Sequence, residues 1–191
     1  LSHGGILSNC EGAVELLKPL TKKKNPVFLT WLPLSHSYEH TIQFIQILVG
    51  AEVFYAESLE KLISNMGLIK PTIMTAVPRF YQNLFTKINI NFEKEKGIKK
   101  KIINMTLSLG KKILKKKKMN FGEKIINLIC NFLVRKKIQN QFGGNLQAFI
   151  SGGGALDQNI GEFLNAIGLP TLQGYGLTEA SPVVSCNLPD L

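Results

Sequence analysis

The chain has 191 residues, 45% of them hydrophobic, which excludes a disordered segment and allows one domain with a substantial core. Its formal net charge is +10, but most of the excess lies between Lys94 and Lys137, so the charge belongs to one segment and does not by itself indicate a nucleic-acid-binding fold. Three scattered cysteines, Cys10, Cys130 and Cys186, exclude a disulfide framework and favour a reducing, cytoplasmic setting, with each thiol a small core residue.

The first half of the chain predicts strands that alternate with helices. Residues 2–17 have apolar positions at helical spacing, and a polar break at residues 22–26 follows. The almost continuous apolar run at residues 27–32 predicts a strand that is buried on both faces. The elements expected next are a helix over residues 38–49 with Ser37 as its N-cap, a strand at 52–55, a helix over 58–66 that ends at Gly67, a strand at 73–77 and a helix over 78–85.

A lysine-rich segment, the basic insert (residues 91–141), interrupts this pattern. Its apolar residues recur at helical spacing and predict two amphipathic helices that join near residues 120–122. The alternation then resumes with a strand at 146–150, a helix over 158–167 that Asp157 caps, and a brief strand at 171–172. The whole pattern predicts an α/β fold with a mostly parallel sheet that helices flank.

Three polar, mostly glycine-rich loops follow predicted strands, at residues 33–37, 151–155 and 174–179. Ligands of parallel sheets bind beyond the carboxyl ends of the strands, so we expect the three loops to lie together. In the third loop, glycines on both sides of Tyr175 would let the backbone approach a flat ligand closely. Thr178 and Glu179 offer a neutral and an anionic oxygen ligand, as a magnesium-bound phosphate needs. The simpler alternative is a turn in which Glu179 caps the next element.

Four short motifs together indicate one kind of nucleotide-binding chemistry. Residues 173–182 read QGYGLTEASP, residues 32–39 read LPLSHSYE, residues 151–156 read SGGGAL, and the chain opens with LSHG. In their order along the chain and in their rough spacing, these four motifs resemble the signatures of the adenylate-forming (AMP-binding) enzyme superfamily, in its long-chain fatty acyl-CoA synthetase branch. The resemblance covers nearly the whole chain, and that branch often carries an insert before its Ser-Gly-Gly segment.

The resemblance implies where the chain belongs in such an enzyme. Residues 1–191 would be a central fragment of the large N-terminal domain, with the basic helical insert at about residues 91–141. The upstream phosphate loop and the small C-terminal domain, with its catalytic lysine, would lie outside the chain. We therefore expect this polypeptide alone to be inactive in adenylation.

The resemblance also implies an activity, that of an acid–thiol ligase. ATP would activate a long-chain fatty acid as an acyl-adenylate, and transfer to coenzyme A would give acyl-CoA, AMP and pyrophosphate. The first step joins two anions, so Mg²⁺ would be the cofactor, while fatty acid, ATP and coenzyme A would be the partners. Transfer to the phosphopantetheine of a carrier protein stays an alternative.

Roles carry over to individual residues by the same resemblance. Glu179 and Thr178 would hold the magnesium ion, Thr178 would also bond phosphate oxygens, and His36 would lie near the carboxylate and help to gate entry of the thiol. For His36 the alternative is a hydrogen bond to backbone only. The residues expected to bind the nucleotide are Gly152, Gly153, Gly154, Ala155, Gln173, Gly174, Tyr175, Gly176 and Thr178.

A hypothesis of another class starts from the basic insert. Lysine clusters with interleaved isoleucine and leucine suit an anionic membrane surface, which would place a cytoplasmic protein at the inner face of a membrane. RNA is disfavoured because aromatic stacking residues are sparse in the insert, and we expect no nucleic-acid partner. A simply solvated lysine-rich face is the remaining alternative.

Overall fold

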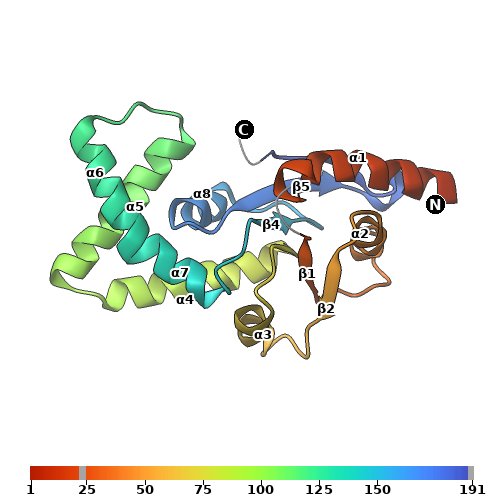
Figure 1. Cartoon of the computed structure of the whole chain (residues 1–191), viewed down its shortest axis with the longest axis horizontal. Coiled ribbons are helices and arrows are strands. Elements are labelled where there is room, and N and C mark those ends of the chain that lie inside the picture. The colour runs from red at the N-terminus through yellow and green to blue at the C-terminus, as the bar shows by residue number, and fades with distance from the viewer. Residues whose placement is uncertain (22–24, 189–191) are drawn as a thin grey trace.

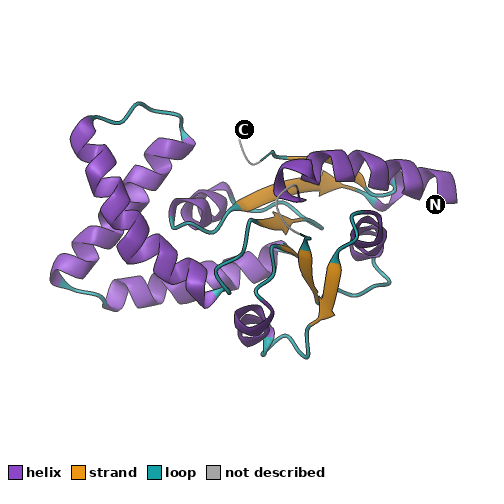
Figure 2. Cartoon of the chain, viewed as in Figure 1, coloured by secondary structure: helices purple, strands orange, loops and turns teal. Residues whose placement is uncertain are grey.

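One central sheet organises the protein, and helices cover both of its faces (Figures 1 and 2). The computed structural model describes residues 1–21 and 25–188; residues 22–24, in the predicted polar break, lie outside the described residues. Across these residues the sheet has six strands in the order β2-β1-β3-β4-β5-β6. Strands β1 to β5 pair in parallel, and β6 pairs antiparallel with β5 at one edge. The predicted α/β fold with a mostly parallel sheet is confirmed.

The elements follow one another in alternation, with a block of helices before β4. In the first part of the chain they are α1 (His3–Thr21), β1 (Val27–Thr30), α2 (Ser37–Leu48), β2 (Glu52–Tyr55), α3 (Leu62–Ile69), β3 (Ile73–Ala76) and α4 (Pro78–Lys94). In the second part they are α5 (Gly97–Leu114), α6 (Phe121–Cys130), the π-helical η1 (Asn131–Arg135), α7 (Lys136–Gln141), β4 (Ala148–Ser151), α8 (Gln158–Ala166), β5 (Thr171–Gly176), the 3₁₀ turn η2 (Thr178–Ala180) and β6 (Val183–Cys186).

Alternate residues of the central strands face two separate cores. Phe28 and Ile150 point to a core with α1 and α2, whereas their neighbours Leu29 and Phe149 point to a larger core with α3, α4, α5, α7 and α8. This is the period of two that a strand imposes on its side chains. All four residues of β3 and of β4 are buried, as expected for parallel strands that helices cover on both faces.

Several element boundaries differ from the prediction for local reasons. Helix α3 passes through Gly67, and its C-cap is Lys70, which adopts the left-handed conformation directly before Pro71. Helix α4 continues to Lys94, well beyond the predicted end at residue 85. Strand β5 is six residues long and includes Gly174–Gly176, because the unpredicted strand β6 supplies an antiparallel partner for this half of the motif.

The basic insert is helical and projects from the sheet (Figure 1). Helix α6 begins with a capping box, in which the Asn120 side chain accepts from the Glu123 N–H and the Glu123 carboxylate accepts from the Asn120 N–H. Glu123 also accepts from Lys112 Nζ at 2.6 Å, which ties α6 to α5. Within the described residues, none of the helices combines the length and hydropathy needed to cross a membrane.

Candidate active site

The three predicted loops surround one cavity of about 940 Å³ at the carboxyl edge of the parallel strands. Side chains of α1 and α2 close it on the other side. Glu179 lies next to the lining residue Thr178 but does not itself line the cavity. The predicted site residues that line it are His36, Gly152, Gly153, Gly154, Ala155, Gln173, Gly174, Tyr175, Gly176 and Thr178.

The motif at residues 173–179 is half strand and half turn. Gly176 sits at an irregularity in the β5–β6 pairing, and a Cβ atom there would lie 2.2 Å from the carbonyl oxygen of Pro182. The hairpin itself therefore requires glycine at this position. The preceding Tyr175 is 60% exposed, so its ring is available to a ligand at the rim of the cavity.

The side chain of Gln173 holds the glycine-rich loop in place. Its Oε1 accepts from the N–H of Leu156 at 3.0 Å, and its Nε2 donates to the carbonyl oxygens of Gly154 and Gly174 at 3.3 and 2.8 Å. The amide thus joins β5 to the loop after β4. Three hydrogen bonds to backbone make Gln173 a support of the cavity wall.

The ring of Tyr38 leaves no room for a side chain at Gly152. A Cβ atom on Gly152 would lie 2.6 Å from Cζ of the Tyr38 ring, which is much closer than carbon atoms approach one another. The Tyr38 hydroxyl donates to the carbonyl oxygen of Ile150 at 3.1 Å, which fixes the ring under the loop. Gly153 has a φ of +74°, which favours glycine for a second, conformational reason.

A hydroxyl pair connects the loop after β1 with the motif at residues 173–179. Ser37 Oγ lies 2.9 Å from Thr178 Oγ1, and either oxygen can donate. The prediction that Ser37 caps α2 is wrong: His36 occupies the N-cap position, and no side-chain hydrogen bond caps the helix. The Ser37 hydroxyl instead bonds to the opposite loop, which only the tertiary structure brings within reach.

Glu179 and Thr178 are suited to a magnesium ion that arrives with a phosphate. The Glu179 carboxylate is exposed, and no ion pair or hydrogen bond connects it to another of the described residues. Among these residues, no group of three or more His, Cys, Asp and Glu side chains could hold a metal alone. One free carboxylate with a neighbouring hydroxyl fits Mg²⁺, which commonly keeps waters and phosphate oxygens as its other ligands.

Asn9, in α1, was not predicted as a site residue, yet it hydrogen-bonds to the segment that directly follows the motif at residues 173–179. Its Nδ2 donates to the carbonyl oxygen of Val183 at 2.6 Å, and its Oδ1 accepts from the N–H of the same residue at 3.0 Å. A longer contact of 3.4 Å reaches the carbonyl oxygen of Ala180. Asn9 therefore anchors the turn that carries Thr178 and Glu179, across a sequence separation that no local pattern could reveal.

Glu39 is a second residue that was missed. It lines the cavity but is fully buried, and its carboxyl group accepts from Thr75 Oγ1 at 3.1 Å and from Gln43 Nε2 at 3.2 Å. Burial raises the pKa of Glu39 from its ordinary 4.5 to about 7, although hydrogen bonds from Thr75, Thr30 and Gln43 oppose this rise. Helical spacing does signal its place, because Ile42 and Gln46, three and seven residues later, are buried on the same face.

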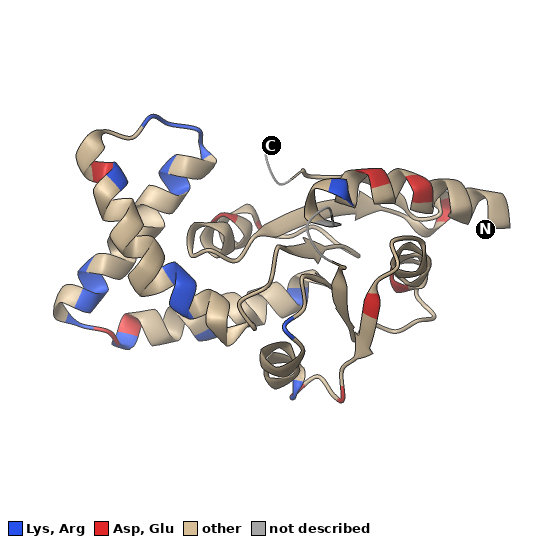
Figure 3. Ribbon diagram, in the orientation of Figure 1, with Lys and Arg blue, Asp and Glu red and all other residues tan. Residues whose placement is uncertain are grey.

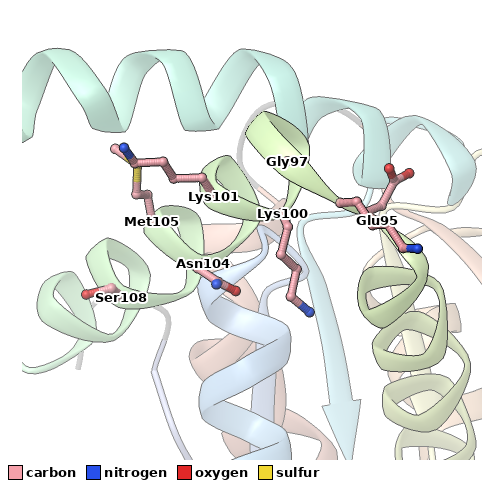
Figure 4. A pocket seen from close by; sticks show the side chains of 8 residues that line it. Glu95, Gly97, Lys100, Lys101, Asn104, Met105 and Ser108 are labelled. Atoms are coloured by element: carbon pink, nitrogen blue, oxygen red, sulfur yellow. The ribbon is translucent and has the colours of Figure 1, made fainter.

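A second cavity, of about 670 Å³, opens at the turn from α4 to α5 (Figure 4). Lys100 extends along this cavity, where its ammonium group donates to Glu93 at 2.8 Å and to the carbonyl oxygen of Phe92 at 3.3 Å. None of the predicted site residues lines it; the lining residues are Glu95, Lys96, Gly97, Lys100, Lys101, Asn104, Met105 and Ser108.

Comparison with known proteins decides the family. The family model described as AMP-binding enzyme matches residues 1–191, the whole chain. The chain belongs to the AMP-binding enzyme family. Curated relatives of this AMP-binding chain include the peroxisomal long chain acyl-CoA synthetase 6 of Arabidopsis thaliana, 29% identical over 97% of the chain. Long-chain-fatty-acid–CoA ligase 1 of Cavia porcellus is 25% identical over 99% of the chain.

Solved structures share the fold of this AMP-binding chain. ATP-bound MatB from Rhodopseudomonas palustris aligns with all of the chain at a TM-score of 0.60 and 17% identity. The adenylation domain of a carboxylate reductase from Mycobacterium chelonae aligns with 90% of it at a TM-score of 0.58 and 20% identity. The chain spans about a quarter of the length of these proteins, 28% and 24%, and similarly 25% and 26% of the two curated relatives.

Proposed function

We propose that the protein activates a long-chain fatty acid with ATP through an acyl-adenylate and transfers the acyl group to coenzyme A. One observation carries this proposal: a single cavity combines the family's nucleotide motif with an apolar wall. The apolar lining residues include Trp31, Leu32, Ile42, Ile45, Val77, Ile150 and Leu172. Such a wall suits an acyl chain, because apolar surface is favourably removed from water there.

The names of the relatives support the finer parts of the proposal. Those quoted above are a long chain acyl-CoA synthetase and a long-chain-fatty-acid–CoA ligase, which favours coenzyme A over a carrier protein as acceptor. Since the chain covers about a quarter of each relative, the remaining groups of the reaction would come from outside these residues. Within this division, residues 1–191 would supply one wall of the nucleotide and acyl site.

Each predicted site residue then has a chemical task. Glu179 and Thr178 would hold Mg²⁺, which when bound neutralises charge on the ATP phosphates. The exposed ring of Tyr175 would stack near the adenine, and the Gly152–Ala155 loop would pass beneath the nucleotide. His36 would lie beside the carboxylate that is to be activated and help to gate the thiol.

The only tryptophan of the chain, Trp31, lines the cavity and therefore reports on binding. We expect a long-chain acyl sulfamoyl-adenosine, an inert mimic of the acyl-adenylate, to change the Trp31 fluorescence in a saturable way. Replacing Tyr175 with alanine should weaken this binding by roughly tenfold, because one stacking surface is lost. The matched control is Tyr55→Ala on β2, since Tyr55 is also 60% exposed but does not line the cavity.

Two results would contradict the proposal. Absence of saturable binding for any acyl length would contradict the assignment of the cavity as the nucleotide and acyl site. Equal affinity for acetyl and long-chain analogues would remove the long-chain assignment and leave only the family chemistry.

The magnesium ligand is tested separately with ATP. We expect Glu179→Gln to abolish the increase in ATP affinity that Mg²⁺ produces, while binding of metal-free ATP stays at the wild-type level. Undiminished magnesium dependence in this variant would contradict the assignment of Glu179. In ATP–pyrophosphate exchange we expect no turnover by the 191-residue chain, and clear turnover would show that these residues suffice for adenylation.

A further inference from the structure

The outer face of the helix that begins at Phe121 carries an exposed row of large apolar side chains. Phe121, Leu128 and Phe132 are 79%, 69% and 67% exposed, and Ile125 and Ile129 are each 47% exposed. Their spacing of three, four and seven residues places them on one side of α6 and η1. We call this row the apolar stripe.

The apolar stripe does not hold the fold together. On the opposite side of the same helical stretch, Cys130, Val134 and Ile138 are buried, and the latter two belong to the larger core. The helix therefore has an inner apolar face with a packing partner and an outer apolar face without one in the described residues. A merely solvated face would be polar, and a contiguous exposed apolar face usually marks a binding surface.

Lysines border this stripe. Residues 97–141 contain thirteen of the 23 Lys and Arg residues of the chain but one of its 13 acidic residues, Glu123, which is already paired with Lys112. The connection from α5 to α6 contains Lys115, Lys116, Lys117 and Lys118 in succession, all exposed and without an ion pair to any described residue. Figure 3 shows this basic connection at the far end of the helical projection.

We propose that the apolar stripe and residues 115–118 form a docking surface for an anionic phospholipid membrane. Phenylalanine, leucine and isoleucine side chains would enter the boundary between headgroups and acyl chains, while the lysines would lie at the level of the phosphates. The lysines complement the negative charge of such a surface, and the apolar side chains match its hydrocarbon boundary.

Charge also argues against the other occupants of this face. A second copy of the chain would bring two strongly cationic surfaces together, which like-charge repulsion opposes. RNA would use the lysines but would gain nothing from the isoleucine and leucine side chains of the stripe. The membrane proposal does not depend on the proposed enzymatic function, because none of its residues lines the 940 Å³ cavity.

Co-sedimentation of the 191-residue chain with lipid vesicles tests the proposal. We expect binding to phosphatidylcholine vesicles that contain phosphatidylserine, little binding to pure phosphatidylcholine, and weaker binding as salt concentration rises. Leu128→Gln with Phe132→Gln should weaken binding by roughly tenfold or more, since two apolar insertions are lost. Both side chains are exposed, so circular dichroism and the urea midpoint should stay at wild-type values.

The lysines are tested with a charge-matched pair of variants. Replacing Lys115, Lys117 and Lys118 with glutamine should also weaken binding by roughly tenfold or more. A control triple variant changes the net charge equally at exposed lysines elsewhere, at Lys18, Lys61 and Lys87, and should bind nearly as the wild type does. Leu68→Gln, at an apolar side chain of α3 that is 78% exposed, controls in the same way for the stripe.

Four results would overturn the proposal. These are failure of the wild-type chain to bind anionic vesicles, equal binding to pure phosphatidylcholine, equal losses in the test and control variants, and binding that the stripe substitutions leave unchanged. Light scattering adds a fifth: a wild-type dimer that does not bind vesicles, and that Leu128→Gln with Phe132→Gln converts to a monomer, would assign the stripe to self-association.

Discussion

Replacing Glu39 with glutamine should change how the stability of the protein depends on pH. The Glu39 side chain is fully buried at the cavity wall, and glutamine has nearly the same shape without the charge. The neighbouring hydrogen bonds can persist, because the oxygen of the introduced amide accepts as a carboxylate oxygen does and the Thr75 hydroxyl can accept from the amide nitrogen. The substitution therefore isolates the cost of ionising the buried carboxyl.

The sign of the effect follows from the raised pKa. In the unfolded chain Glu39 should titrate near its ordinary 4.5, whereas in the folded protein its pKa is raised to about 7. Between these values the folded state holds the extra proton, so the wild type loses stability as pH rises, and the loss is complete above about pH 7. At about 1.36 kcal/mol for each pH unit between the two pKa values, the total is about 3 kcal/mol.

Urea denaturation at a series of pH values measures this effect. We expect the free energy of unfolding of Glu39→Gln to rise relative to the wild type by about 3 kcal/mol between pH 4.5 and pH 8. The difference between the two proteins cancels the titration of other groups, and Glu11→Gln on the exposed side of α1 controls for the loss of a carboxyl group. Parallel curves for wild type and Glu39→Gln would contradict the raised pKa of Glu39, since they would mean that this carboxyl titrates alike in the folded and unfolded states.

Two further predictions concern the supports of the cavity. Gly152→Ala should destabilise the fold by about 1–3 kcal/mol, because the new methyl group would overlap the Tyr38 ring, whereas Gly154→Ala, with its nearest neighbour at 3.5 Å, should cost less in the same urea titration. Asn9→Ala should lower the free energy of unfolding by about 1–3 kcal/mol, because the backbone N–H and carbonyl groups of Val183 in β6 lose their bonds to the Asn9 side chain. The control is Ser8→Ala, at the exposed neighbouring residue. Equal urea midpoints for the two variants would contradict the role of Asn9.

Much of the fold could be predicted because its signals are local. The apolar runs at residues 27–32 and 146–150 predicted buried strands, and the side-chain cap at Asp157 is present, with its carboxylate accepting from Asn159 and Ile160 N–H groups. Strand β6 was not predicted, because a short edge strand of mixed polarity has no distinctive pattern until its partner β5 is known.

The candidate site also has features that the sequence predicted and features that it could not predict. Sequence motifs identified the three loops, because the chemistry of a nucleotide site depends on residue types at close spacing. The motifs could not show that Gly152 accommodates Tyr38 or that Gln173 braces the neighbouring loop, since these contacts join residues far apart in the chain. The roles of Thr178 and Glu179 toward magnesium stay predictions, which the ATP titration tests.

Local composition and motif order were sufficient to predict the α/β class, the family resemblance and the basic character of residues 91–141. The tertiary structure decided which residues meet: the Ser37–Thr178 hydroxyl pair, the Asn9 anchor, the buried carboxyl of Glu39 and the outward position of the apolar stripe. Helical periodicity predicts that a helix has an apolar side. It does not predict which of two apolar sides the core will cover, because that depends on packing against elements distant in the chain.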